Sequence, residues 1–163
     1  NGKSYSNSFQ IDISFEPIER FTVTTAYKKY DVKSTYSGVL LEKPMVPKDR
    51  ALLNLSYATN FKKWQFDYTV KWFGVTRLPN ADSIPSQYHI HGTSESYFVM
   101  NAQITKRFKF FELYLGAENI TDFTQHNPIV AAEDPFGSNF DASMIWGPID
   151  GRLFYGGLRF TLN

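Results

Sequence analysis

The stretch that decides the fold runs from Lys63 to Val75 and reads KWQFDYTVKWFGV. Every second position is apolar or glycine, and most of these side chains are large: Trp64, Phe66, Tyr68, Val70, Trp72 and Gly74. The positions between them are mostly polar: Gln65, Asp67, Thr69, Lys71 and Phe73. Successive side chains of a β-strand point to opposite faces, so the pattern predicts a strand with one ring-rich apolar face and one polar face.

The same alternation occurs six more times along the chain. It predicts strands over residues 6–16, 20–31, 50–58, 97–107, 110–119 and 154–162. Short turns follow the first, third and fifth strands, whereas long loops (32–49, 76–96 and 120–151) follow the second, fourth and sixth. All prolines lie in these connections, as expected because proline cannot donate a hydrogen bond to a ladder. This connectivity predicts an all-β fold, an antiparallel transmembrane β-barrel.

The composition agrees with a barrel and excludes several other classes. A net charge of +1, with 20% charged residues, leaves no polybasic surface for nucleic acid, so we expect no nucleic-acid partner. Mean hydropathy is −0.34 and no run approaches the roughly 18 apolar residues of a spanning helix. Aromatic residues make up 17% of the chain, which suits strands and the belts at membrane interfaces. There are no cysteines, so neither disulfides nor thiolate metal sites are available.

The strand count leads to a further expectation about the size of the barrel. Single-chain bacterial barrels have an even number of strands, with short turns on the periplasmic side and long loops outside. Seven strands would leave the two ends of the chain on opposite sides of the membrane. We therefore expect residues 1–163 to form about seven strands of a larger barrel, with no domain boundary inside the chain.

Two segments near the end of the chain carry a more specific signal. Residues 115–123 read LGAENITDF, and residues 151–160 read GRLFYGGLRF. Together they resemble the carboxy-terminal end of TonB-dependent outer-membrane receptors, and the matching positions are Asn119, Asp122, Gly151, Arg152 and Phe160. One departure is that the last strand continues to Leu162 and Asn163, where many outer-membrane barrels end on an aromatic residue. Taken singly, Asn119 and Asp122 suit a turn, and Arg152 is expected to reach toward charged headgroups.

The resemblance implies a function that the residues alone do not show. It implies the carboxy-terminal part of a barrel of roughly 22 strands in the cell outer membrane, with the plug domain absent from this chain. The implied activity is active import of a bulky, scarce nutrient such as a siderophore, corrinoid, haem or oligomer, without a cofactor or enzyme activity. The implied partners are outer-membrane lipid and lipopolysaccharide, the rest of the barrel and its plug, the TonB complex and a surface lipoprotein. Two alternatives remain open, namely a passive porin or diffusion channel, and a small outer-membrane enzyme or adhesin.

Candidate binding residues lie in the long loops. His89, His91 and His126 are the only histidines, but no nucleophile motif surrounds them, and two neighbouring histidines without a third ligand do not define a metal site. The loop from Asp134 to Pro148 is unusually aromatic, and within it Phe136, Asn139 and Trp146 are candidates to hold a bulky substrate. The alternative is a loop that packs its rings on itself over the barrel mouth.

The polar sides of the strands are expected to line the lumen. Their side chains would hydrogen-bond a plug or water: Gln10, Asp12, Lys28, Asn54, Asp67, Lys71, Asn101, Gln103, Glu112 and Glu118. Arginine is therefore expected to cost more at Phe66 or Leu115, on the lipid side, than at Thr69 or Gly116.

Overall fold

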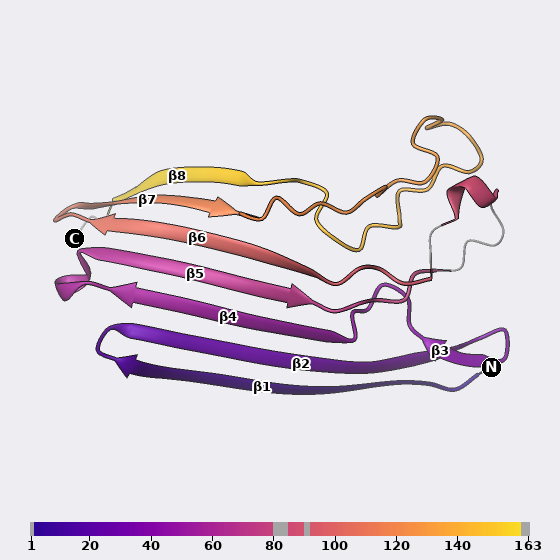
Figure 1. Cartoon of the computed structure of the whole chain (residues 1–163), viewed down its shortest axis with the longest axis horizontal. Coiled ribbons are helices and arrows are strands. Elements are labelled where there is room, and N and C mark those ends of the chain that lie inside the picture. Colours follow the sequence, from indigo (N-terminus) through magenta and orange to yellow (C-terminus); the bar gives the residue numbers. More distant parts are fainter. Residues whose placement is uncertain (1, 80–84, 90–91, 161–163) are drawn as a thin grey trace.

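The computed structural model describes residues 2–79, 85–89 and 92–160, which form one antiparallel sheet (Figure 1). Its strands are β1 (Ser4–Ile18), β2 (Phe21–Tyr36), β3 (Val39–Glu42), β4 (Asp49–Ala58), β5 (Trp64–Phe73), β6 (Tyr97–Arg107), β7 (Phe111–Glu118) and β8 (Leu153–Phe160). The helices are two single 3-10 turns, Asn60–Lys62 and Ser86–Tyr88. No helix in the described part of the chain is long and apolar enough to cross a membrane.

The sheet follows the chain order, and its connections alternate in length as predicted. Neighbouring strands run β1-β2-β4-β5-β6-β7-β8, and β3 pairs only with β2. Short turns join β1 to β2, β4 to β5 and β6 to β7 at one end of the sheet, and the long loops gather at the other end (Figure 1). Among the described residues the sheet is open, with β1 and β8 as its edges. The all-β antiparallel fold is therefore confirmed, with seven strands on the main path.

One strand, β3, was not predicted, and it does not change the order of the other strands in the sheet. It pairs with the outer part of β2, from Lys33↔Glu42 to Tyr36↔Val39, after a turn in which Gly38 has φ +82. The inner part of β2 pairs with β4, from Phe21↔Tyr57 to Lys29↔Asp49. Strands β3 and β4 therefore pair with the same edge of β2, one after the other, and residues 43–48 separate them. Together they occupy the place of a single strand in the sheet order.

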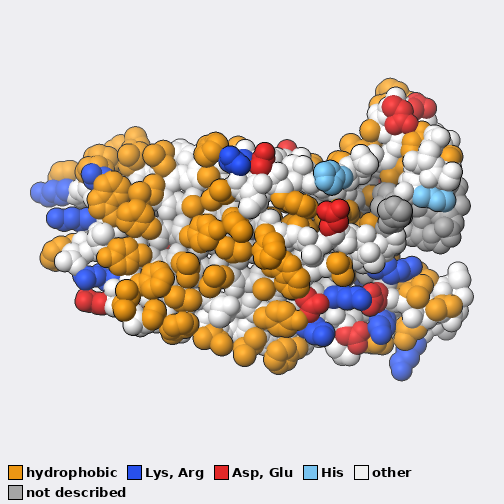
Figure 2. All heavy atoms as spheres, in the orientation of Figure 1, with side chains coloured by type: hydrophobic (Ala, Val, Ile, Leu, Met, Phe, Trp, Pro, Cys, Tyr) orange, Lys and Arg blue, Asp and Glu red, His pale blue; other side chains and the backbone are white. Residues whose placement is uncertain are grey.

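The register gathers the apolar side chains on one face, which we call the apolar face. Directly paired residues of an antiparallel sheet point to the same side. One such row crosses all seven strands of the main path: Phe15, Val23, Leu55, Tyr68, Ala102, Ala117 and Phe154. Apolar side chains cover much of the sheet in Figure 2, and Phe154 is 72% exposed. An exposed apolar surface of this extent requires an apolar environment or a partner.

The opposite side, the polar face, carries the predicted hydrophilic positions. The row next to the one above contains Ser14, Thr24, Asn54, Thr69 and Asn101. Buried residues are instead found at or beyond the strand ends, where the long loops meet: Thr76, Leu78, Ser94, Tyr97, Asn119, Gln125, Val130, Ala131 and Met144. The tightest packing of the molecule is therefore at the long-loop end.

Candidate functional site

Four aromatic rings form a cluster at the long-loop end of the polar face. Tyr97, the first residue of β6, stacks on Phe73 at the end of β5 with ring centroids 4.9 Å apart. On its other side it stacks on Phe123 at 4.8 Å and lies 5.7 Å from the ring of Trp146. The Tyr97 hydroxyl donates to the carbonyl of Trp146 at 3.1 Å. We call these four residues the aromatic cluster, and it joins two strands to the β7–β8 loop.

A single buried amide, Gln125, closes the β7–β8 loop. Its Nε2 donates to the carbonyl of Met144 at 2.8 Å, and its Oε1 accepts the backbone N–H groups of Trp146 at 2.7 Å and Gly147 at 3.0 Å. Its own N–H donates to the carbonyl of Pro148 at 2.7 Å. The sequence analysis missed this residue because one glutamine in a loop belongs to no recognisable motif. It holds the two arms of the loop together, and it holds Trp146 in the aromatic cluster.

The β5–β6 and β7–β8 loops also contact each other. Val130, Ala131 and Met144 form a buried apolar group in the second loop, and Tyr88 from the first loop packs against it. The Tyr88 hydroxyl donates to Oε1 of Glu133 at 2.5 Å. That bond lowers the pKa of the Glu133 carboxyl, because it stabilises the anion, and raises the pKa of Tyr88. The two loops thus pack on each other.

The candidate substrate residues are not gathered in one place. Trp146 belongs to the aromatic cluster, whereas Phe136 is fully exposed and Asn139 is half-buried. The side chains of His89 and His126 are exposed, and His91 lies outside the described residues. Within residues 2–79, 85–89 and 92–160, no three His, Cys, Asp or Glu side chains lie close enough to hold a metal. A binding role for these residues stays a prediction.

The structure brings four of the five motif residues together at the base of the β7–β8 loop. Asn119 and Asp122 adopt positive φ angles of 47 and 58, as residues in turns can. Asn119 Nδ2 donates to the carbonyl of Phe123 at 2.7 Å, and Asp122 Oδ1 accepts the backbone N–H of Arg152 at 2.6 Å. A Cβ on Gly151 would lie 2.6 Å from Asp122 Oδ1, which explains the glycine.

Two motif side chains remain, Arg152 and Phe160. Arg152 Nε donates to the carbonyl of Ile120 at 2.9 Å, which fastens the loop, and the expected reach of this side chain toward headgroups stays a prediction. Phe160 lies in β8 on the apolar face, 67% exposed, with its ring 6.0 Å from that of Phe111. The motif residues therefore shape the end of the sheet and do not form a reactive centre.

Hydrogen bonds link neighbouring strands along the polar face. Asn54 Nδ2 donates to Thr69 Oγ1 at 2.8 Å, and the Ser56 hydroxyl donates to Asp67 Oδ1 at 2.7 Å. At the short-turn end, Glu112 pairs with Arg107 at 2.5 Å and with Arg159 at 3.2 Å. Several predicted lumen residues thus bond to side chains of the neighbouring strand, which leaves fewer groups free for a ligand than the sequence suggested.

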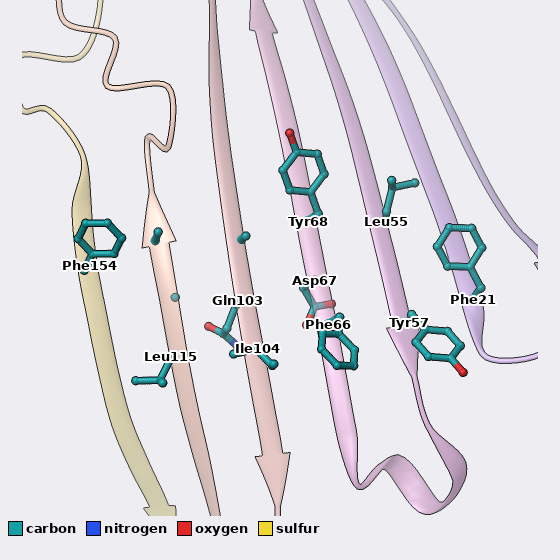
Figure 3. Close-up of a pocket in the computed structure, with 13 residues that line it drawn as sticks. Phe21, Leu55, Tyr57, Phe66, Asp67, Tyr68, Gln103, Ile104, Leu115 and Phe154 are labelled. Atoms are coloured by element: carbon teal, nitrogen blue, oxygen red, sulfur yellow. The ribbon is translucent and has the colours of Figure 1, made fainter.

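The apolar face carries a hollow of about 530 Å³ (Figure 3). Its centre is the directly paired Ala102 and Ala117, whose small side chains leave space. The rings of Phe66, Tyr68 and Phe154 stand around it (Figure 3). Almost all of its surface is apolar, so it suits hydrocarbon and offers no chemistry for catalysis.

Comparison with known proteins supports the fold. No protein-family model matches the sequence, and no curated protein matches it. Two solved structures, both variants of the ferric enterobactin receptor PfeA from Pseudomonas aeruginosa, match with a TM-score of 0.62 at 15% sequence identity. The match covers 95% of this chain and 22% of the receptor chain, so this chain spans only that share of the receptors' length. The sheet therefore has the fold of part of a receptor barrel.

Proposed function

We propose that this chain is part of the barrel wall of a TonB-dependent outer-membrane transporter that imports a bulky nutrient. The observation that carries the proposal is the two-faced sheet with every long loop at one end. This sheet superposes on part of a receptor, and the match covers 95% of this chain. In this function the apolar face contacts outer-membrane lipid and lipopolysaccharide, and the polar face lines the lumen beside a plug. The long loops face outside, where they meet the nutrient and a surface lipoprotein.

The open edges of the sheet agree with a wall segment of a larger barrel. Strands β1 and β8 each have one unpaired side among the described residues. Unpaired backbone N–H and carbonyl groups are very costly in hydrocarbon, so spanning sheets close on themselves. A barrel of roughly 22 strands would supply the missing neighbours. The described residues of the polar face show no assembled catalytic group, and transport needs none.

The experiment that tests the function measures uptake in cells that carry the intact gene, its deletion, or the gene with the β7–β8 loop deleted. Growth on limiting siderophore-bound iron, corrinoid, haem or oligosaccharide identifies the nutrient. We expect uptake that a protonophore and loss of TonB both abolish. Uptake that persists without the proton-motive force would contradict active transport and support a passive channel. Alanine at His89, His91 and His126 should leave uptake unchanged, and a loss would revive a metal or catalytic role.

A further inference from the structure

A second hollow, of about 340 Å³, lies on the polar face near the long-loop end. Three basic side chains line it, one from each of three adjacent strands: Lys28 in β2, Arg50 in β4 and Lys71 in β5. Gln10, Tyr30 and Phe73 lie at its sides, and the small side chain of Ala26 leaves room between them. We call this hollow the basic recess.

The cations of the basic recess have no ion-pair partner among the described residues. Lys28 and Arg50 are direct cross-strand partners, and like charges in that position repel each other. Within the described part of the chain, Lys28, Arg50 and Lys71 form no ion pair, although other cations do, such as Lys48 with Glu42 at 2.8 Å.

Two carboxylates lie near the recess in the register, and neither forms an ion pair with its three cations. Asp12 in β1 shares the polar face, but its Oδ2 accepts a hydrogen bond from Gln10 Nε2 at 2.8 Å. Asp49, next to Arg50 in the chain, points to the opposite face and accepts a hydrogen bond from Tyr27. Three cations that lack an ion-pair partner around one hollow repel one another, so an anion bound between them would be stabilised.

Aromatic rings hold the cations in place. The Arg50 guanidinium lies 5.5 Å from the ring centroid of Phe73 and 5.8 Å from that of Tyr30, and Lys28 Nζ lies 4.8 Å from the Tyr30 ring. A guanidinium positioned between two rings presents a planar fork of N–H donors, which matches carboxylate and phosphate oxygens. Phe73 also stacks on Tyr97, so the recess is continuous with the aromatic cluster.

We propose that the basic recess binds a small anionic ligand with at least two carboxylate or phosphate groups. Arg50 takes one group bidentately, and Lys28 and Lys71 neutralise the others. The inference rests on the proposed function only in placing the recess inside the barrel, and it narrows the nutrient to an anionic one. It also assigns roles to Arg50 and Tyr30, which the sequence analysis did not single out.

The test uses the full-length protein extracted from outer membranes in detergent, with citrate and pyrophosphate as probes in titration calorimetry. We expect saturable binding of at least one probe below about 1 mM. Lys28→Gln, Arg50→Gln and Lys71→Gln should each weaken binding about tenfold, the loss of one charge-assisted hydrogen bond. The preferred probe distinguishes carboxylates from phosphates. Circular dichroism checks that each variant keeps its strands.

Lys29→Gln is the matched control, because Lys29 is exposed, neighbours Lys28 and points to the opposite face. It should bind like the unchanged protein. No saturable binding of either probe, or an equal loss in Lys29→Gln, would overturn the proposal. If the protein is an energised transporter and yet binds no anion, the recess fails and the proposed function stands. If the protein binds anions but uptake needs no energy, the proposed recess stands and active transport fails.

Discussion

Tyr155 in β8 covers Gly116 in β7, its direct cross-strand partner. A Cβ on Gly116 would lie 2.3 Å from Cζ of the tyrosine ring, so only glycine leaves the ring its place. The ring passes over β7, and its hydroxyl donates to Gln103 Oε1 in β6 at 2.9 Å. The next pair on the same face, two residues along, has the reverse arrangement, with Tyr114 over Gly157. A Cβ on Gly157 would lie 2.4 Å from the hydroxyl oxygen of Tyr114.

Gly116→Ala should therefore displace the Tyr155 ring and break its bond to Gln103. We expect a loss of about 1 to 3 kcal/mol in the free energy of unfolding, from the hydrogen bond and the repacking together. Denaturant titration in detergent or lipid measures it. Tyr155→Phe is the control, because it keeps the ring and removes only the hydroxyl, at about 1 kcal/mol. Equal stability of all three proteins would show that the crossing contact contributes nothing.

The two faces should respond differently to arginine. Phe66→Arg, on the apolar face, should cost about 2 to 4 kcal/mol in a bilayer, and so should Leu115→Arg. Thr69→Arg, on the polar face, should cost about 1 kcal/mol, mainly its hydrogen bond from Asn54. Gly116, expected to tolerate arginine as well, is unsuitable as a control because Tyr155 covers it. Equal costs at Phe66 and Thr69 in lipid vesicles would contradict the membrane assignment.

Removing the Gln125 side chain should loosen the β7–β8 loop without unfolding the sheet. Gln125→Ala leaves the carbonyl of Met144 and the N–H groups of Trp146 and Gly147 without their partner, at roughly 1 to 3 kcal/mol for each group that stays buried. Hydrogen exchange at residues 144–147 should accelerate strongly. His126→Ala changes the exposed neighbouring residue and should have no effect. Unchanged exchange in Gln125→Ala would mean that packing alone holds the loop.

The contact between the two long loops should weaken in acid. The pKa of Glu133 is lowered by the hydroxyl of Tyr88, so this bond stabilises the loops above the ordinary pKa of a glutamate. The stabilisation is lost as the pH falls through the pKa of Glu133 in the docked state, which lies below the ordinary pKa of a glutamate. Proteolysis or hydrogen exchange of the loops between neutral and acidic pH measures the effect.

Glu133→Gln should reduce this pH dependence but not remove it. The pKa of Asp141 is also lowered, by hydrogen bonds from the hydroxyl and backbone N–H of Ser143, and it contributes with the same sign. A pH profile identical to that of the unchanged protein would show that the bond from Tyr88 to Glu133 does not hold the loops together.

The strands and their faces were predictable because they obey a local rule with a period of two. The stretch from Trp64 to Phe73 shows this best, since its alternation sets both the strand and the row each side chain joins. Strands β1 and β2 extend past their predicted ends because residues such as Lys33 and Ser34 continue the ladder without an apolar face. Strand β3 was missed because its four residues are too few to display a period.

The contacts at the long-loop end were not predictable from the sequence. Tyr88 meets Glu133, and Tyr97 meets Trp146, across separations that no local pattern encodes. The basic recess was also not predictable from the sequence. Lys28 and Lys71 were expected on the polar face, but their position around Arg50 depends on the register of three strands.

The docking of Tyr88 on the β7–β8 loop has a mechanical consequence for the two long loops. Tyr88 belongs to the β5–β6 loop, so its contacts with Val130, Met144 and Glu133 join two segments that the chain connects only through β6 and β7. In the proposed transporter, a nutrient could not displace one segment and leave the other in place without first breaking this contact. The described parts of the two loops are therefore expected to move as one unit relative to the strands β5 to β8.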